Sequence, residues 1–168
     1  MASTSEPRGL LTGDETLAVW RLDDARHAAS WDSGEGAYRV GGRWNRPGMR
    51  AVYCSLDAAT AILEVAVHKG FGVLARVPHM LSEIIVSRRH VHTVHIGSIP
   101  DADWLLPDVP TIEQQTYGDA LLRAHCFVMI PSVVSPKSWN LMFDAGRAAG
   151  FYSLRSQEEF VLDRRLKR

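Results

Sequence analysis

The sequence has few of the features that mark secreted, membrane-spanning or metal-binding chains. Only two cysteines, Cys54 and Cys126, occur among its 168 residues. Two are too few for a disulfide framework, and they lack the CxxC spacing of a metal or redox site. We expect both to be reduced thiols in a cytoplasmic protein. No apolar run reaches the roughly 18 residues of a membrane-spanning helix, and the first residues hold no apolar stretch typical of a signal peptide.

An excess of charge of one sign is also missing. Nineteen Lys and Arg residues balance nineteen Asp and Glu residues, so the formal net charge is zero. Nonspecific attachment to nucleic acid or to an anionic membrane depends on a concentrated positive field, and we therefore expect neither. Because a near-zero charge gives little repulsion between molecules, it is compatible with self-association or with a resident partner protein.

The common catalytic motifs are absent as well. The sequence has no phosphate-binding loop, no GxGxxG, no GxSxG elbow and no HExxH. On a strand His90 and His92 would share a face that His95 does not, so we expect no zinc site. His125 and Cys126 would point to opposite faces of a strand, which makes them a poor pair for thiol catalysis.

Length and composition favour one compact domain. A chain that is 46% hydrophobic and 23% charged is close to the average for globular proteins. Residues 1–16 are small and polar and are broken by proline and glycine, which predicts a flexible N-terminal tail. We therefore expect a single domain over residues 17–168, without internal repeats.

Several short strands and two principal helices predict a mixed α/β fold. We expect strands over residues 17–22, 50–55, 81–86, 91–96, 126–130 and 159–163. An apolar helix is expected to begin after Ser55 or Asp57 and to end at Gly70.

A second helix is expected over residues 111–125, because Thr111 and Gln114 resemble a capping box. The polar stretch 23–36 predicts a surface loop. Residues 137–150 predict a mixed segment with a short helix.

Three residues have the chemistry to bind an anionic ligand that contains a planar ring. Arg43 follows two glycines, which let the backbone approach a ligand closely. Together with Arg21 it supplies two planar guanidinium groups, which suit a pyrophosphate. Tyr53 could stack on a planar ring. Each also has a simpler interpretation, namely a surface ion pair for either arginine and ordinary core packing for Tyr53.

Glu64 is the only acidic residue in the middle of the apolar helix. It shares one stripe with Asp57, Thr60 and His68 at helical spacing. Because the rest of the helix must be buried, this stripe faces either solvent or a cleft. Ser132, at the end of an expected strand, could bond a ligand or cap the following turn.

Taken in order along the chain, these segments resemble the RES domain family, which is named for its Arg, Glu and Ser residues. The matching segments are Gly41-Gly42-Arg43-Trp44-Asn45, Val52-Tyr53-Cys54-Ser55, Ala61-Ile62-Leu63-Glu64, Thr116-Tyr117-Gly118-Asp119, Ile130-Pro131-Ser132-Val133-Val134, Asn140 and Phe160-Val161-Leu162-Asp163-Arg164-Arg165-Leu166. The family continues this asparagine region into Asn-Pro-x-His-Pro, whereas Asn140 is followed by Leu141. The departure leaves the role of Asn140 open.

The resemblance implies an ADP-ribosyltransferase-like core of short mixed strands flanked by helices. It implies the toxin of a bacterial type II toxin–antitoxin system, an enzyme that depletes NAD by hydrolysis or by phosphorolysis with inorganic phosphate as co-substrate. NAD is then a substrate rather than a bound cofactor. The implied partner is an Xre-like helix-turn-helix antitoxin that binds DNA itself, and a toxin homodimer within such a hetero-oligomer is compatible with the neutral charge.

The resemblance also implies a role for each site residue. Glu64 would stabilise positive charge that develops on the ribose. Arg21 and Arg43 would hold the pyrophosphate, Tyr53 would pack on the nicotinamide ring, and Ser132 would orient ribose or phosphate. Two alternatives stay open: a protein ADP-ribosyltransferase that uses the same cleft, and an inactive module that only binds the antitoxin.

Overall fold

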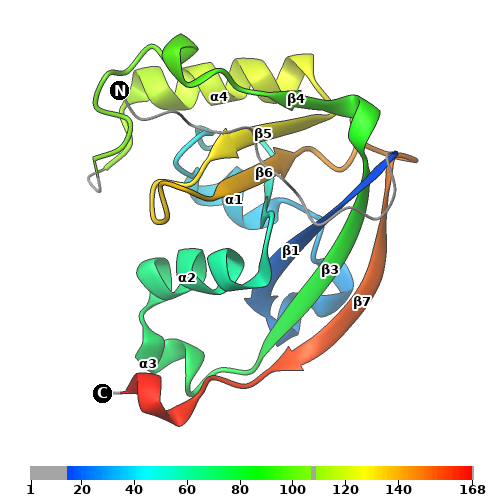
Figure 1. Cartoon of the computed structure of the whole chain (residues 1–168), viewed down its shortest axis with the longest axis vertical. Coiled ribbons are helices and arrows are strands. Elements are labelled where there is room, and N and C mark those ends of the chain that lie inside the picture. The colour runs from blue at the N-terminus through cyan, green and yellow to red at the C-terminus, as the bar shows by residue number, and fades with distance from the viewer. Residues whose placement is uncertain (1–14, 107–108, 168) are drawn as a thin grey trace.

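A computed structural model describes residues 15–106 and 109–167 of the chain (Figure 1). They form a single mixed α/β domain built on one seven-stranded sheet, in the order β4-β5-β6-β2-β1-β3-β7. The strands are β1 (Thr16–Asp24), β2 (Val52–Ser55), β3 (His79–Ser87), β4 (Val91–Thr93), β5 (Phe127–Pro131), β6 (Trp139–Phe143) and β7 (Tyr152–Phe160). Strands β4 and β5 run parallel, and every other neighbouring pair is antiparallel. The expected fold class is confirmed.

Four α-helices and four short 3-10 helices accompany the sheet in the described residues. They are α1 (Glu35–Val40), α2 (Ala58–Lys69), α3 (Phe71–Leu74), α4 (Ile112–Ala124), η1 (Ala25–Ser30), η2 (Arg88–His90), η3 (Ile96–Ser98) and η4 (Arg164–Lys167). The two principal helices begin where their caps predict. The Asp57 carboxylate accepts the Thr60 N–H at 2.7 Å, and the Thr111 hydroxyl accepts the Gln114 N–H at 3.1 Å. Among the described residues, no helix is both long and apolar enough to cross a membrane.

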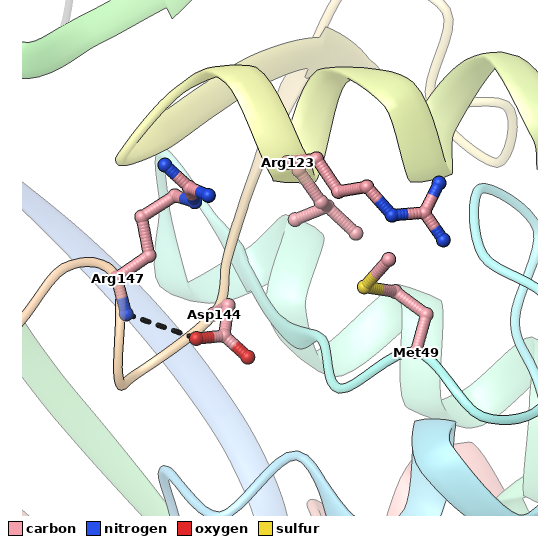
Figure 2. A pocket seen from close by; sticks show the side chains of 5 residues that line it. Met49, Arg123, Asp144 and Arg147 are labelled. Carbon is pink, nitrogen blue, oxygen red and sulfur yellow. Dashed lines mark hydrogen bonds between the residues drawn. The ribbon is translucent and has the colours of Figure 1, made fainter.

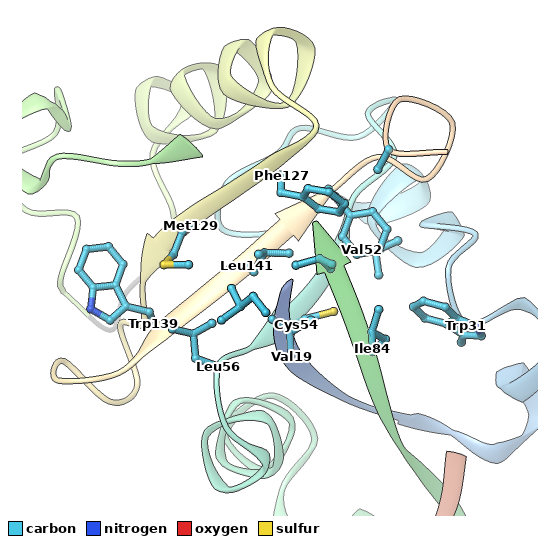
Figure 3. Close-up of a cluster of buried hydrophobic side chains, with 14 residues drawn as sticks. Val19, Trp31, Val52, Cys54, Leu56, Ile84, Phe127, Met129, Trp139 and Leu141 are labelled. Carbon is cyan, nitrogen blue, oxygen red and sulfur yellow. The ribbon is translucent and has the colours of Figure 1, made fainter. Parts of the chain in front are cut away.

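The sheet has two halves that meet at a narrow seam. Strands β1 and β3 pair along their whole length, whereas β1 pairs with β2 only at Trp20 and Ser55. The long strands β1, β3 and β7 can therefore curve away from the short strands β4, β5, β6 and β2, as Figure 1 shows. The largest hydrophobic cluster joins both halves: Val19 and Ile84 of the long strands pack with Phe127 and Leu141 of the short ones (Figure 3).

Strand β5 contributes side chains to two different clusters. Phe127 and Met129 belong to the cluster between the halves, and Val128 and Ile130 belong to a second cluster that includes Leu122 of α4. All five residues of β5 are buried, because α4 covers one face of the strand while the long strands lie beyond the other. This arrangement explains the continuous apolar run.

Two predictions about the C-terminal third were wrong. Residues 139–143 form β6, a strand between β2 and β5, instead of a short helix. The last strand spans 152–160 instead of 159–163. It lies at the edge of the sheet and is mostly exposed, so polar side chains occupy it and the apolar alternation that marks a half-buried strand is absent.

Other boundaries also differ from the prediction. Residues 23–36 include the end of β1, the 3-10 helix η1 and the start of α1, so this stretch is not one loop. Strand β4 ends at residue 93, three residues earlier than expected. Residues 1–14 of the predicted tail lie outside the described residues. Thr16, the last residue of the predicted tail, is already the first residue of β1. Both cysteines are free thiols, as expected.

Gly118 of α4 tests how closely this helix approaches the segment that follows Gly42. A Cβ atom at Gly118 would lie 1.9 Å from the Trp44 carbonyl oxygen. Gly118→Ala must therefore push the helix away from backbone, and we expect the free energy of unfolding to fall by about 1–3 kcal/mol or more. Urea denaturation measures the loss.

Gly36→Ala is the matched control, since a Cβ atom at Gly36 of α1 would meet nothing within 4 Å. Alanine is the better helix former, so we expect this variant to be as stable as the original or up to about 1 kcal/mol more stable. Equal losses in the two variants would contradict the close helix contact.

Candidate active site around Glu64

Glu64 lies on α2 opposite the ends of three strands. Ser55 is the last residue of β2, Ser132 follows β5 directly, and Asn140 lies near the beginning of β6. Antiparallel pairing makes Ser55 and Asn140 direct neighbours across β2 and β6. The fold thus gathers four polar side chains from four separate elements.

Two hydrogen bonds hold the Glu64 carboxylate by one of its oxygens. Oε1 accepts the Ser132 hydroxyl at 2.7 Å and the Asn140 side-chain amide at 2.6 Å. Among the described residues, no hydrogen bond reaches the second oxygen, Oε2. Glu64 is half-buried, and its carboxylate has one oxygen held by the protein while the other lacks a hydrogen bond from the described residues.

Each of the two donors, Ser132 and Asn140, accepts a further hydrogen bond. The Ser135 backbone N–H donates to the Ser132 hydroxyl oxygen at 2.9 Å, and the Ser55 hydroxyl donates to Asn140 Oδ1 at 2.7 Å. Ser132 is 0% exposed and Ser55 is 2% exposed. Buried polar groups that are hydrogen-bonded at both ends have little freedom to turn, so the position of Glu64 is well defined.

Arg43 supplies a cation that senses the charge of Glu64. Partial burial lowers the pKa of Arg43, and the negative charge of Glu64 opposes this shift. The guanidinium donates from Nη1 to the backbone carbonyls of Trp104, at 3.5 Å, and Leu106, at 3.3 Å. The site therefore combines an anionic carboxylate with a cation that lies within its electrostatic reach.

Tyr53 holds the turn that carries Arg43. Its hydroxyl donates to Asn45 Oδ1 at 2.7 Å and accepts the Trp44 N–H at 3.2 Å. Burial raises the pKa of this hydroxyl well above its ordinary value. Gly42 must be a glycine, because a Cβ atom there would lie 2.9 Å from the Tyr53 hydroxyl oxygen. The phenol thus fixes the turn, and its expected stacking on a ligand ring stays a prediction.

Arg21 lies behind Tyr53 and is not hydrogen-bonded to Glu64. It donates to the Tyr53 backbone carbonyl at 3.0 Å and to the Asp23 carboxylate at 2.5 Å. Burial raises the pKa of the Cys54 thiol to about 12, and the Arg21 charge opposes this rise. The structure therefore brings Glu64, Ser132 and Arg43 together and places Arg21 next to the backbone of β2, so a role for it in pyrophosphate binding stays a prediction.

Ser55 and Asn45 are site residues that sequence reasoning missed, and the role of Asn140 had been left open. Asn45 donates from Nδ2 to the backbone carbonyls of Ala37, Arg46 and Met49 and so closes the turn around Arg43. A signal for Asn45 and Ser55 was present, because both stand inside the segments that resemble the family. The partner of Ser55 depends on the register between β2 and β6, which the sequence does not display.

The histidines considered for a metal site take part in ring packing. His92 stacks on His125 with a centroid distance of 3.9 Å, and His90 stacks on Phe151 at the same distance. Burial lowers the pKa of His125, and the neighbouring His92 and Arg147 lower it further. Within the described ranges, no group of three His, Cys, Asp or Glu side chains could hold a metal ion.

A separate cavity of ≈ 490 Å³ lies at the opposite end of the short strands (Figure 2). Its lining residues are Met49, Leu122, Arg123, Asp144 and Arg147. Asp144 follows the end of β6, whereas Asn140 lies near the beginning of that strand. None of the five lining residues takes part in the hydrogen bonds around Glu64, so this cavity is distinct from the Glu64 site.

Comparison with known proteins places this arrangement in context. Residues 18–163 match the RES domain. Toxin Res of Photorhabdus laumondii is 29% identical over 129 residues, which cover 76% of this chain and 81% of that protein. The Prs ADP-ribosylating toxin of Sphingobium sp. strain YBL2 is 30% identical over 136 residues, which cover 77% of this chain and 83% of that protein.

The fold resembles a solved structure. One chain in the crystal structure of the M. tuberculosis MbcT–MbcA toxin–antitoxin complex superimposes with a TM-score of 0.71. The likeness covers 87% of this chain and 85% of that chain, at 22% sequence identity. The TM-score shows a shared fold, and at this identity the likeness shows the fold alone.

Tyr53→Phe tests whether the phenol fixes the turn. The substitution leaves the Trp44 N–H and Asn45 Oδ1 without this partner in a buried setting, and we expect a loss of about 1–3 kcal/mol in the free energy of unfolding. Tyr38→Phe is the control, because Tyr38 is 42% exposed and its ring, which lies under Arg50, is kept. Urea denaturation compares them, and equal stability of the two variants would refute the role.

Proposed function

The chain belongs to the RES domain family, and we propose that it is the toxin of a toxin–antitoxin pair and that it cleaves the nicotinamide–ribose bond of NAD. Family membership and the relatives that are named Toxin Res support the first part. The relative named as an ADP-ribosylating toxin supports the use of NAD, because ADP-ribose is the part of NAD that remains when nicotinamide leaves.

The observation that carries the proposal is the geometry of Glu64. Its Oε1 is held by Ser132 and Asn140, and its Oε2 is left to a ligand. A carboxylate with one free oxygen is suited to stabilise a positive charge that develops beside it. Cleavage of a glycosidic bond builds such a charge on the sugar ring, in an oxocarbenium-like transition state.

The proposed reaction needs little proton transfer. The bond between ribose C1′ and the nicotinamide nitrogen breaks, and its electron pair stays with the nicotinamide, which enters as a cation and leaves neutral. An oxygen of water or of phosphate then forms the new bond to C1′. When water is the acceptor, the surplus proton passes to solvent. Glu64 stabilises the charge on the ribose between these events and does not have to act as an acid.

Arg43 is proposed to bind the pyrophosphate. Its guanidinium lies within electrostatic reach of Glu64, and planar guanidinium groups pair well with phosphate oxygens. Arg21 would add a second cation, Tyr53 would pack on the nicotinamide ring, and Ser132 would orient ribose or phosphate in addition to its bond to Glu64.

Transfer of ADP-ribose to a protein is the second candidate function. The similarity to the Prs ADP-ribosylating toxin favours it. The same carboxylate and arginine would serve either reaction, since only the acceptor that attacks C1′ differs. Labelled product on a protein, with little free ADP-ribose, would distinguish transfer from hydrolysis and phosphorolysis.

An antitoxin is the proposed partner. The fold likeness to a chain in a toxin–antitoxin complex supports a protein partner. We propose an Xre-like helix-turn-helix protein, so that DNA binding belongs to the partner. The zero net charge of this chain agrees with that division, because DNA binding needs a basic surface.

Glu64→Gln is the first test of the proposed function. Glutamine keeps an oxygen that can accept the bonds from Ser132 and Asn140, so the fold should persist, while the negative charge is lost. We expect nicotinamide release from NAD to fall by about 1,000-fold. Chromatography of the products, with and without inorganic phosphate, measures the rate and identifies the acceptor.

The control for this test is Glu159→Gln, which removes an exposed carboxylate from β7 and should leave the rate unchanged. Unchanged turnover in a folded Glu64→Gln variant would eliminate the proposed role of this residue. A purified, antitoxin-free protein that neither releases nicotinamide nor labels a protein would favour the inactive antitoxin-binding module.

Arg43→Ala tests the proposed pyrophosphate contact. Loss of one charged donor should cost about 2–4 kcal/mol of transition-state stabilisation, seen as a lower kcat/KM for NAD. Arg39→Ala is the control, because Arg39 lies on the exposed face of α1, where it pairs with Glu35. Kinetics of Arg43→Ala equal to those of Arg39→Ala would refute the contact.

A further inference from the structure

We propose that Ser55 and Asn140 are positioning residues that orient Glu64 and keep its Oε2 free for the ribose, an inference that rests on the proposed function. Neither residue needs to touch the substrate in this scheme. They act through one chain of hydrogen bonds, in which Ser55 donates to Asn140 and Asn140 donates to Glu64.

The direction of this chain follows from the chemistry of the asparagine side chain. An amide has an acceptor end and a donor end. The Ser55 hydroxyl occupies the acceptor, Asn140 Oδ1, at 2.7 Å, which turns the donor, Nδ2, toward Glu64 Oε1 at 2.6 Å. Without Ser55 the amide could turn over and present its carbonyl oxygen to the carboxylate, a contact between two acceptors.

Ser132 is oriented in a corresponding way from the other side. The Ser135 backbone N–H donates to the Ser132 hydroxyl oxygen, which leaves the hydroxyl hydrogen for Glu64. Both donors converge on Oε1, so the carboxylate is supported in its charged form, and charge-assisted hydrogen bonds are the stronger kind. Their convergence on one oxygen leaves Oε2 free.

The buried surroundings of Ser55 indicate that its hydroxyl serves to orient Glu64. Its neighbour Cys54 and the Asn140 neighbour Leu141 are both buried in the main core, and Ser55 itself is 2% exposed. An apolar side chain would avoid the cost of burying a hydroxyl at this position. Among the described residues, the path of side-chain hydrogen bonds from Ser55 leads through Asn140 to Glu64.

Ser55→Ala in the purified, antitoxin-free chain is the test. We expect kcat for NAD cleavage to fall by about 10- to 100-fold with KM little changed, since binding groups stay in place while the carboxylate is misoriented. A purely structural role for Ser55 would lower stability without this split between kcat and KM.

Two further variants sharpen the result. Ser55→Thr keeps a hydroxyl on Cβ and should recover most of the rate. Ser153→Ala removes an exposed hydroxyl from β7 and should change neither kcat nor KM. If Ser55→Ala retains the kcat of the original protein, or if Ser55→Thr fails to restore it, the positioning role is overturned.

A second readout separates this inference from the proposed function. The ¹³C signal of the Glu64 carboxylate, assigned by its absence in Glu64→Gln, is compared at one fixed pH in the original protein and in Ser55→Ala. A shifted signal in Ser55→Ala supports the positioning role even if NAD is not the substrate, because the hydrogen bonds to the carboxylate have changed. Identical signals overturn it, even if the original protein cleaves NAD.

Discussion

The hydrogen bonds that meet at Glu64 Oε1 are the interaction on which the candidate site depends. They join α2 to Ser132, which lies 68 positions further along the chain, and to Asn140, 76 positions further. The bond between Ser55 and Asn140 spans 85 positions. One carboxylate oxygen thus ties a helix directly to the ends of two strands, and through Asn140 to the end of a third. Because the same bonds support the charged form of Glu64 and leave its second oxygen free, the contact that anchors the helix also prepares the proposed chemistry.

Ser55 links this site to the architecture of the sheet. It is the β2 residue that pairs with Trp20 at the seam between the two halves, and on its other side it pairs with Asn140. The narrow seam allows the long strands to curve around the main core. Ser55 is therefore both the residue at the seam and the first donor in the chain of hydrogen bonds that leads to Glu64. The bend of the sheet and the placement of the carboxylate thus involve the same residue.

Arg43 is placed by a second, independent set of contacts. The Tyr53 hydroxyl and the Asn45 amide close the turn that carries it, and α4 presses on the same segment where Gly118 lies against the Trp44 backbone. The cation and the anion are thus held by different elements. Such an arrangement suits a ligand that carries negative phosphates next to a sugar that develops positive charge, as the pyrophosphate and nicotinamide ribose of NAD would do in the proposed reaction.

Local signals in the sequence were enough to predict α2, α4 and most of β5, and they marked Arg43, Glu64 and Ser132 as candidate site residues. These features depend on capping residues, on apolar runs and on short segments that resemble a known family. β6 and the edge strand β7 were misassigned, because a short strand and an exposed strand owe their structure to their neighbours in the sheet. The partners of Ser55 and Asn140 depend on the register between β2 and β6. The residue types were determined by the sequence, but only the tertiary structure decided which oxygen of Glu64 is held, because that choice needs side chains brought together across 68 to 85 positions of chain.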